Sequence, residues 1–358
     1  MQLKGAGVLQ IEPSDHCNLQ CKMCAPHRDN WSQVHGVPKG HLSVPLWDKI
    51  LAGFVEEQIS FDHIIFQWLG DPLLHPYLDL LISKTAKLMY EQVGYLRVDT
   101  NAILLDPQRA RNLVEAACGN TPPLLMVFSI DAATPEVYLH TKGRDMLRVV
   151  RKNIRYLLQL RKKKAASCNL NVQLQFVVQP ENAHETEMFL QYWKDLLECY
   201  GGAFWHDEIM FKRLSVDGGA QGQSQADKLY AQNVFQRGIS SGKIGHVSIE
   251  TWQDRPWQND DLNSQRRTPC PGLWMTPVIR HDGHLMMCCA DLHGELNLGS
   301  LEEHSFRDLW EGEKADTIRL KHLDGVFEGV CKSCGGINWY TLQQQQIDKT
   351  LRRRSELH

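Results

Sequence analysis

The sequence lacks any apolar run that approaches the length of a membrane-spanning helix, and its first residues carry no apolar core typical of a secretory signal. It also lacks a strong charge of either sign, because the formal net charge is only −3. That balance gives no global reason to expect a nucleic-acid partner. We therefore expect a soluble, cytoplasmic protein with no membrane partner, for which nucleic acid is an unlikely partner.

The chain has little of the cysteine density that marks a secreted disulfide scaffold, since its 11 cysteines are spread over 358 residues. Hydrophobic residues make up 42% and charged residues 23%, as in an ordinary globular protein. A chain of this length can bury a large core and should form one large domain and a smaller one. In a reducing compartment, cysteines that cluster indicate metal binding.

The first 213 residues alternate short β-rich runs with longer helical patterns. Strands are predicted at 7–12, 61–69, 94–100, 123–131, 170–178 and 206–213. Helices are predicted near 44–58, 76–91, 106–118, 134–140, 145–164 and 183–200, with start signals at Ser43, Asp106 and Thr134. Six such units predict an α/β fold with a parallel sheet and outer helices, whose chemistry lies at the carboxyl ends of the strands.

Three cysteines follow the first predicted strand within eight residues: Cys17, Cys21 and Cys24. A closed zinc site needs four ligands, so a compact triplet favours a metal centre that keeps one position open. A 4Fe-4S cluster held by three thiolates leaves one iron free. The spacing resembles the CxxxCxxC signature of the radical S-adenosylmethionine (radical SAM) superfamily. The resemblance implies that S-adenosylmethionine chelates the fourth iron.

Later strand ends carry further motifs in the order of that superfamily. Leu69-Gly70-Asp71-Pro72 resembles its GGEP motif, with Asp in place of Glu, and Asp99-Thr100-Asn101 resembles its Thr-Asn-Gly element. Ser129-Ile130-Asp131 resembles the segment that binds the ribose and carboxylate of the cofactor, and Lys142 stands where relatives usually have Arg. Each motif alone could be a turn with a helix cap. Together they imply cofactor contacts from Gly70, Asp71, Pro72, Asn101, Ser129, Asp131 and Lys142.

A second cysteine set lies near the C-terminus and comprises Cys270, Cys288, Cys331 and Cys334. The turn around Gly283 predicts a hairpin that brings Cys270 and Cys288 together, and the CxxC pair adds two more thiolates. Four thiolates could saturate zinc or an iron-sulfur cluster, and spacing alone does not separate these. The stretch resembles the SPASM or twitch extension of radical SAM enzymes, which implies one auxiliary 4Fe-4S cluster. Cys289 is a spare thiol by default, with a ligand or hydrogen-donor role as the alternative.

The predicted fold is a partial (β/α)6 TIM-like barrel with a smaller C-terminal SPASM/twitch iron-sulfur domain. A Gly/Gln/Ser-rich, irregular stretch separates the two and predicts a linker. The predicted parts are the radical SAM partial barrel at 1–213, a bridging segment at 214–268, the auxiliary cluster domain at 269–340 and a helical tail at 341–358.

The resemblance implies an enzyme that uses a 5′-deoxyadenosyl radical to abstract a hydrogen atom. With one auxiliary cluster and only 16 residues before Cys17, we expect two-electron oxidation of a secondary alcohol of a sugar- or cyclitol-like molecule. The alternative is a maturase that crosslinks, epimerises or forms a thioether in a ribosomal peptide. A third reading, an iron-sulfur electron carrier, conflicts with the cofactor motifs. A flavodoxin- or ferredoxin-type electron donor is the implied partner. No catalytic acid or base can be named from the sequence.

Overall fold

The chain begins with the strand–helix repeats that its sequence predicts, as a computed structural model shows. The structure describes residues 3–4, 7–24, 39–202, 204–214, 219–251, 269–332, 334, 336 and 340–356. The repeats comprise strands β2 (Val8–Ile11), β3 (Ile59–Phe66), β4 (Val93–Thr100), β5 (Leu124–Ser129), β6 (Leu170–Val178) and β7 (Glu208–Arg213). The helices that follow them are α2 (Val44–Glu56), α3 (Leu78–Leu88), α4 (Pro107–Ala116), α5 (Pro135–Lys142), α6 (Leu147–Lys164) and α7 (Thr186–Tyr200).

The three predicted helix starts are confirmed by their hydrogen bonds. Ser43 accepts from the amide of Leu46, Asp106 accepts from Gln108 and Arg109, and Thr134 accepts from Val137. Each cap satisfies amide groups that have no partner inside the helix, and a proline follows within the first two helical positions. Short 3-10 turns complete this part of the chain at Pro72–Leu74, Ala165–Ser167 and Ala183–Glu185.

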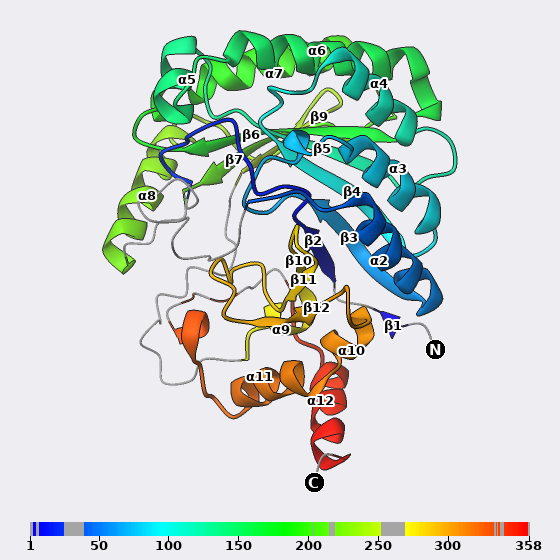
Figure 1. Ribbon diagram of the computed structural model, residues 1–358. Coiled ribbons are helices and arrows are strands. Elements are labelled where there is room, and N and C mark those ends of the chain that lie inside the picture. Colours follow the sequence, from blue (N-terminus) through cyan, green and yellow to red (C-terminus); the bar gives the residue numbers. More distant parts are fainter. Residues whose placement is uncertain are drawn as a thin grey trace.

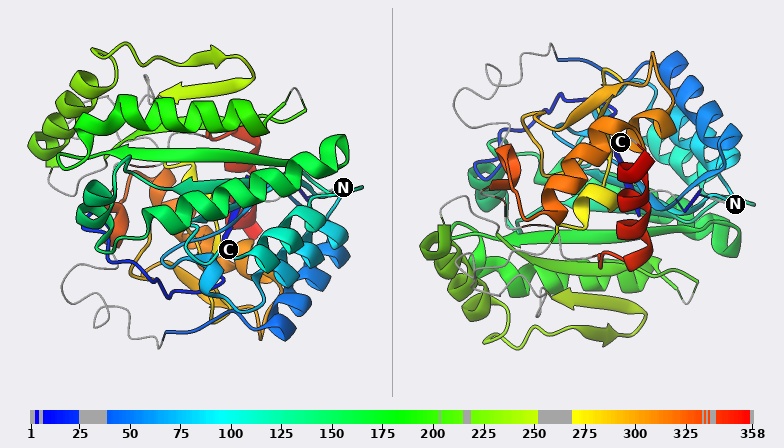
Figure 2. Two further views of the ribbon diagram at one scale, coloured as in Figure 1. Left: turned by 90° about the horizontal axis from the view of Figure 1, so that it is seen from above. Right: turned by 90° about the horizontal axis from the view of Figure 1, so that it is seen from below.

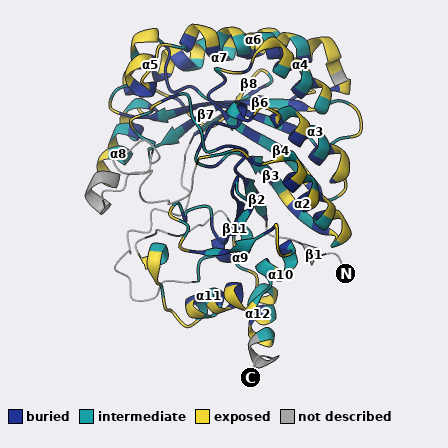
Figure 3. Ribbon diagram, viewed as in Figure 1, coloured by how far each residue is buried: buried dark blue, intermediate teal, exposed yellow. Residues whose placement is uncertain are grey.

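Strands β2 to β7 pair in parallel in the order of the chain. Helices α2 to α7 cover one face of this sheet, and the C-terminal region lies beside its β2 edge (Figure 1, Figure 2). On the helix-covered face the strands bury large apolar side chains such as Phe66, Phe128 and Phe176. Figure 3 shows the consequence, with buried strands beneath helices whose outer faces are exposed. This is the predicted α/β barrel arrangement.

The sheet does not end at residue 213, so the predicted linker over 214–268 is wrong for 219–251. Helix α8 (Gly219–Asn233) is followed by β8 (Gly242–Ile244) and β9 (Val247–Thr251), and β9 pairs in parallel with β7. The Gly/Gln/Ser composition concealed a helix, which is held to β7 by the Tyr230 hydroxyl as it donates to the Phe211 carbonyl at 2.8 Å. The remainder of the predicted bridge, at 215–218 and 252–268, lies outside the described residues.

The C-terminal region joins the same sheet at its other edge. Strand β10 (Val278–Ile279) pairs in parallel with β2, and β11 (His284–Met286) and β12 (Asn297–Ser300) continue it in antiparallel fashion. The hairpin predicted around Gly283 is thereby confirmed, with Gly283 at φ +82° in its turn. The described sheet runs β12-β11-β10-β2-β3-β4-β5-β6-β7-β9-β8, and β1 (Leu3–Lys4) pairs with β3. The boundary predicted at residue 268 therefore lies between strands of one sheet.

Short helices complete the C-terminal region: α9 (Gly272–Met275), α10 (Phe306–Trp310), α11 (Glu313–Leu323), a 3-10 turn at Gly329–Lys332, and α12 (Gln344–Glu356). The ring of Phe306 packs edge-on against Phe54 and Phe61, with centroids 5.3 and 5.9 Å apart. These contacts fix α10 to α2 and β3. The predicted helical tail is a helix, and in the described part of the chain no helix is long and apolar enough to cross a membrane.

Candidate functional site

The cysteine triplet lies on a loop that leaves the carboxyl end of β2 and crosses directly over Gly70. A methyl group at Gly70 would stand 2.3 Å from the Ser14 carbonyl oxygen and 2.6 Å from the His16 carbonyl oxygen. The amide of Asp71 donates to the same His16 carbonyl at 2.8 Å. Glycine is therefore required at position 70 because the two backbones touch. The motif after β3 thus forms the surface on which the cysteine loop lies.

Two of the three thiols lie close enough to influence each other. Burial raises the pKa of the Cys17 thiol to about 11, and the nearby Asp71 and Cys21 add to this. Burial also raises the pKa of Cys21, which lies near the Lys142 ammonium group. The amide of Cys24 donates to the Cys21 carbonyl at 3.1 Å, so the third cysteine follows in a tight turn. Buried thiols of this kind suit an iron-sulfur centre, because bound iron supplies the positive charge that stabilises a thiolate.

Asp71 is buried, with 5% of its surface exposed, and protein donors surround its carboxylate. It accepts from the Thr100 hydroxyl at 3.0 Å, the Asn101 amide at 2.7 Å and the Leu73 amide at 3.0 Å. Burial raises the pKa of this carboxyl, and the hydrogen bonds counteract part of that rise. Asp71 therefore ties the ends of β3 and β4 together and caps the turn that begins at Pro72, which is itself buried.

Asn101 continues this connection to the cysteine loop. Its side-chain amide donates to the side chain of Asn18 at 2.8 Å, and its oxygen accepts from the Ile103 amide at 2.9 Å. Asn18 lies between Cys17 and Cys21 in the chain. The end of β4 thus holds the middle of the cysteine loop in place.

Asp131 and Lys142 form a buried ion pair beside the same loop. The Lys142 ammonium lies 2.5 Å from the Asp131 carboxylate, and the side chains are only 3% and 0% exposed. Burial alone would lower the pKa of Lys142, but the attraction of Asp131 and Cys21 outweighs it and raises the pKa. Asp131 adopts a left-handed backbone at φ +59° and also accepts from the Val177 amide at 2.7 Å.

The end of α5 brings this ion pair to the cysteines. The carbonyl of Lys142 accepts from the Gln20 amide at 3.2 Å, and the next residue, Gly143, ends the helix at φ +78°. Ser129 ends β5 and stands opposite Gln175 in the register with β6. The sequence-predicted residues thus lie at one end of the sheet, where Asp71, Asn101 and Lys142 contact the cysteine loop.

The second cysteine set also converges in the structure, from three separate segments. Burial raises the pKa of Cys331 to about 12, and Cys288, Cys334 and Cys270 lie close enough to raise it further. The Gly336 amide donates to the Cys334 sulfur at 3.4 Å, and a methyl group at Gly336 would stand 3.9 Å from the Cys270 sulfur. Within the described residues, no group of Cys, His, Asp and Glu surrounds a single point closely enough to bind one metal ion. Four thiolates that converge in this way suit an iron-sulfur cluster, which distributes its thiolates over several irons.

A tryptophan that the sequence did not single out joins the two sites. The Trp68 indole donates to the carbonyl of Cys289 at 3.0 Å. Trp68 immediately precedes the Leu69-Gly70 segment beneath the first cysteine loop, whereas Cys289 adjoins Cys288. The side chains of Cys288 and Cys289 hydrogen-bond to each other, an interaction that raises the pKa of Cys288. Cys289 therefore lies beside Cys288 and Cys270 in the second site.

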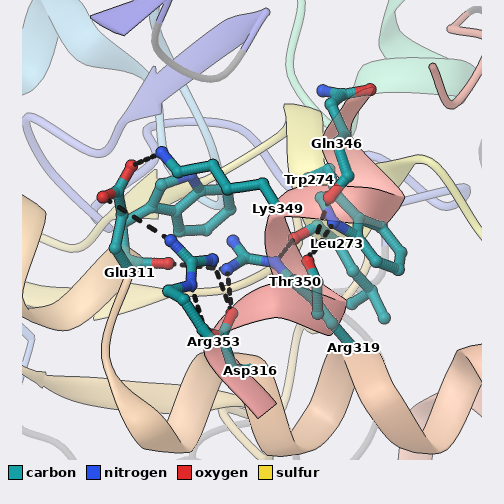
Figure 4. Close-up of polar contacts among 10 residues, drawn as sticks. Leu273, Trp274, Glu311, Asp316, Arg319, Gln346, Lys349, Thr350 and Arg353 are labelled. Carbon is teal, nitrogen blue, oxygen red and sulfur yellow. Dashed lines mark hydrogen bonds and ion pairs between the residues drawn. The ribbon is translucent and has the colours of Figure 1, made fainter. Parts of the chain in front are cut away.

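A network of charged side chains holds helix α9, which follows Cys270. Arg319 in α11 donates to the Leu273 carbonyl at 3.0 Å and pairs with Asp316 at 3.1 Å. Arg353 of the C-terminal helix pairs with the same carboxylate at 2.5 Å (Figure 4). The Thr350 hydroxyl accepts from the Trp274 indole at 3.1 Å. Helix α12 is therefore part of the support of the second cysteine site.

Polar side chains line the face of the sheet that turns away from the helices. His63 stacks on Tyr95 with ring centroids 4.5 Å apart, and Arg97 makes two 2.6 Å hydrogen bonds to Asp99. Gln173 donates to Glu208 at 2.8 Å. None of these residues was predicted as a site residue. The signal that could have found them is the alternation of polar and apolar residues along β4 and β6.

Comparisons with known proteins agree with both cysteine sites. Residues 11–192 match the radical SAM superfamily, and residues 270–335 match the SPASM iron-sulfur cluster-binding domain. A Pyrococcus furiosus protein named as the tungsten-containing aldehyde ferredoxin oxidoreductase cofactor-modifying protein is 24% identical over 345 residues, which cover 91% of this chain and 86% of that protein.

Two solved structures share the fold. Streptococcus suis SuiB bound to S-adenosylmethionine has a TM-score of 0.59 at 15% identity, covering 93% of this chain and 73% of SuiB. BtrN in complex with AdoMet and 2-DOIA has a TM-score of 0.50 at 14% identity, covering 96% of this chain and 98% of BtrN.

Proposed function

Because the chain belongs to the radical SAM superfamily and carries a SPASM iron-sulfur domain, we propose that this radical SAM enzyme oxidises a secondary alcohol of a polar small molecule by two electrons. Its cofactors are S-adenosylmethionine with a 4Fe-4S cluster and an auxiliary iron-sulfur cluster in the SPASM domain. When bound, S-adenosylmethionine and its cluster supply a radical that takes a hydrogen atom from the substrate, and the auxiliary cluster accepts an electron.

The residues of this chain hold these groups as follows. Cys17, Cys21 and Cys24 ligate the first cluster, and the second cysteine set defined above ligates the auxiliary cluster. Gly70, Asp71 and Pro72 form the backbone ledge beside the first cluster, and the Asp71 carboxylate keeps that ledge attached to β4. Because residues 70–72 are hydrogen-bonded to the cysteine loop, the two segments keep a fixed relative position. They would therefore hold the methionine group of a bound cofactor in a fixed position relative to the cluster.

The other proposed cofactor contacts come from the ends of β4 and β5 and from α5. Asn101 and Ser129 present neutral polar groups, and Lys142 presents a cation that is already balanced by Asp131. The balanced pair places little net charge against the cofactor, so we assign Asp131 and Lys142 to holding the loop and orienting a bound carboxylate or ribose.

The polar inner face of the sheet supports the substrate class more than any other observation. Carboxylates such as Asp99 and Glu208 can accept two hydroxyl or ammonium hydrogen bonds, and Arg97 and Gln173 can donate. The His63–Tyr95 stack adds a flat apolar surface of the kind that packs against a ring. A hydroxylated or amino-substituted ring satisfies this mixture of donors and acceptors.

The relatives differ in whether their names and structures include a small molecule or a peptide. The Pyrococcus relative is named for modifying a cofactor, and BtrN was solved with 2-DOIA, whereas SuiB was also solved with its precursor peptide SuiA. We favour the small molecule because the inner face presents several charged groups close together. The initiating electron would come from a flavodoxin- or ferredoxin-type donor.

The test uses anaerobically reconstituted protein with S-adenosylmethionine and a low-potential reductant. A panel of polyols and aminocyclitols carrying deuterium at the carbinol carbon is compared with short cysteine- and lysine-containing peptides. The proposal expects deuterium in 5′-deoxyadenosine and a product lighter by two hydrogens with a panel alcohol. Transfer from peptides alone would favour a maturase, and a protein that never cleaves S-adenosylmethionine would favour an electron carrier.

Glu208→Gln and Glu303→Gln form a matched pair for the substrate site. Glu208 lies on the inner face, whereas Glu303 is exposed on the C-terminal region. We expect Glu208→Gln to lower kcat/KM for the alcohol by about tenfold to a hundredfold, the loss of one charge-assisted hydrogen bond of about 1.5–3 kcal/mol. Glu303→Gln should leave kcat/KM unchanged.

A further inference from the structure

Two cysteines outside both cluster sites face each other at the opposite end of the barrel. Cys118 follows α4 and Cys168 lies two residues before the start of β6, and they form an isolated antiparallel bridge. The amide of Gly119 donates to the Ser167 carbonyl at 3.1 Å, and the amide of Asn169 donates to the Ala117 carbonyl at 2.8 Å. The hydrogen bonds therefore flank the two cysteines and do not join them.

This register brings the two side chains together. In a pair flanked in this way the Cα atoms are roughly 4.5 Å apart, at the short end of the 4.4–6.8 Å range found across disulfides. Both sulfurs also point to the same acceptor, because Cys118 Sγ lies 3.0 Å and Cys168 Sγ 3.7 Å from the Val114 carbonyl oxygen. Cys118 also lies close enough to Cys168 to raise the pKa of its thiol.

The backbone around Cys168 is fixed by its neighbours. The Trp205 indole donates to the Cys168 carbonyl at 2.9 Å, and the Arg161 guanidinium stacks on the Trp205 ring at 4.3 Å. Arg161 is itself paired with Asp207, and both side chains are completely buried. A bond between the two sulfurs would therefore form within an existing framework.

From this geometry we propose that Cys118 and Cys168 form a reversible disulfide when the protein meets a peroxide. The half-buried Cys118 reacts first: its thiolate sulfur displaces hydroxide from hydrogen peroxide and becomes a sulfenic acid. The Cys168 sulfur then attacks that sulfur, the S–S bond forms, and water leaves with the thiol proton. Two thiols are oxidised by two electrons, and one peroxide is reduced to two waters.

The disulfide would crosslink two elements of the barrel at the end opposite to the cysteine triplet. The end that carries the proposed cofactor contacts would be unchanged. The bond links the end of α4 to the start of β6, whereas the cysteine triplet lies at the carboxyl ends of the strands. The closed loop of about 50 residues would restrict the unfolded chain and raise its free energy relative to the folded state. The barrel would then stay folded under oxidation, a condition in which iron-sulfur clusters are lost.

Burial influences the rate of this reaction. It is the main cause that raises the pKa of Cys168 to about 12, so few Cys168 thiolates are present at neutral pH. The nearby Lys164 ammonium is paired with the Glu115 carboxylate at 2.5 Å, so its charge is largely balanced there.

The experiment treats the reconstituted full-length protein with one to a few equivalents of hydrogen peroxide, then alkylates free thiols and maps the peptides by mass spectrometry. We expect a peptide crosslinked between Cys118 and Cys168, two hydrogens lighter than the dithiol and released by dithiothreitol. The unfolding midpoint should rise by several degrees and fall back on reduction.

Cys199→Ser is the matched control because Cys199 is an exposed thiol on α7, and it should keep both the crosslink and the rise in midpoint. Cys118→Ser should abolish both. The wild-type peptide map decides the matter even where a serine variant folds poorly. Peroxide that leaves these two cysteines as separate thiols or as sulfinic acids, with no reducible crosslink, would overturn the proposal.

Discussion

Gly70 shows that a single methyl group decides whether the cysteine loop can lie over the strand ends. The backbone carbonyls of Ser14 and His16 occupy the space that a Cβ atom at Gly70 would need. Backbone atoms cannot rotate away as a flexible side chain can, so the loop itself would have to move. That loop carries the residues that we assign to the first cluster.

Gly70→Ala should therefore displace the loop, lower the iron content of the first site and weaken binding of S-adenosylmethionine by at least tenfold. Gly53→Ala is the control, because no atom lies within 4 Å of a Cβ at Gly53 in α2. That change should stabilise the protein by about 0.5–1 kcal/mol through helix propensity. Iron analysis and equilibrium binding measure the two outcomes. Normal binding by Gly70→Ala would contradict the assigned contact.

His63 illustrates how burial sets the charge of the inner face. Burial, with a contribution from Arg97, lowers the pKa of His63 from 6.5 to about 4. As the pH falls below 6.5, the unfolded chain therefore binds a proton that the folded chain refuses until about pH 4. The free energy of unfolding should fall by about 3 kcal/mol across this window on account of His63 alone.

His63→Phe keeps a ring against Tyr95 but removes the titrating group, so the variant should lose this part of the pH dependence. Urea unfolding at several pH values between 4 and 7 measures the difference from wild type. His304→Phe serves as a control, since His304 is exposed and its replacement should leave the pH profile unaltered. An unchanged profile in His63→Phe would refute the assignment.

At the level of elements, the C-terminal helix α12 contributes to a cysteine site although its own sequence contains no cysteine. Its Arg353 shares Asp316 with Arg319, and Arg319 reaches the carbonyls of Leu273 and Trp310. The Arg319 guanidinium also lies over the Trp310 ring at 4.7 Å. Helix α9, beside Cys270, is thus held by two helices that come later in the chain.

Asp316→Ala should destabilise the protein by about 3–5 kcal/mol, because it leaves two arginines without their shared buried carboxylate. It should also lower the iron content of the auxiliary site while the first site stays loaded. Lys321→Ala breaks the exposed pair with Glu328 and should cost about 0–1 kcal/mol. Urea unfolding and iron analysis test both variants, and similar stabilities would count against the network.

The elements also show what the sequence could reveal. Strong hydrophobic periodicity and caps such as Asp106 and Thr134 predicted the barrel strands and helices. These elements are determined by interactions between residues that are close in the sequence. The linker prediction failed at α8, a helix that packs against β6 and β7 although its Gly- and Gln-rich sequence is typical of a linker. The pairing of β10 with β2 joins residues about 270 positions apart, and no local pattern encodes such a contact.

The candidate site also has features that the sequence revealed and features that required the fold. Cysteine spacing and the strand-end motifs located the predicted residues, and the structure brings most of them together. Their detailed roles required the fold: Asp71 and Asp131 face protein donors, a fact that only the positions of Thr100, Val177 and Lys142 reveal. Trp68 was missed because a tryptophan after a strand carries no signal until its partner at Cys289 is known.

At the scale of the whole molecule, one sheet connects the two cysteine sites. Strand β2 leads into the first cysteine loop, and its neighbour β10 begins the hairpin that leads to Cys288. Trp68 adds a second connection through Cys289. The two proposed clusters are therefore held on one continuous framework.

The central claim is that the chain holds two separate iron-sulfur clusters, of which only the first cleaves S-adenosylmethionine. It is tested most directly by iron and sulfide analysis together with 5′-deoxyadenosine formation on anaerobically reconstituted protein. We expect about eight irons per wild-type chain and about four in the Cys17→Ala/Cys21→Ala/Cys24→Ala variant, which should form no 5′-deoxyadenosine. Cys331→Ala/Cys334→Ala should also hold fewer irons but still cleave S-adenosylmethionine. Cleavage that survives loss of the first triplet, or a wild-type chain with about four irons and one zinc, would contradict the account.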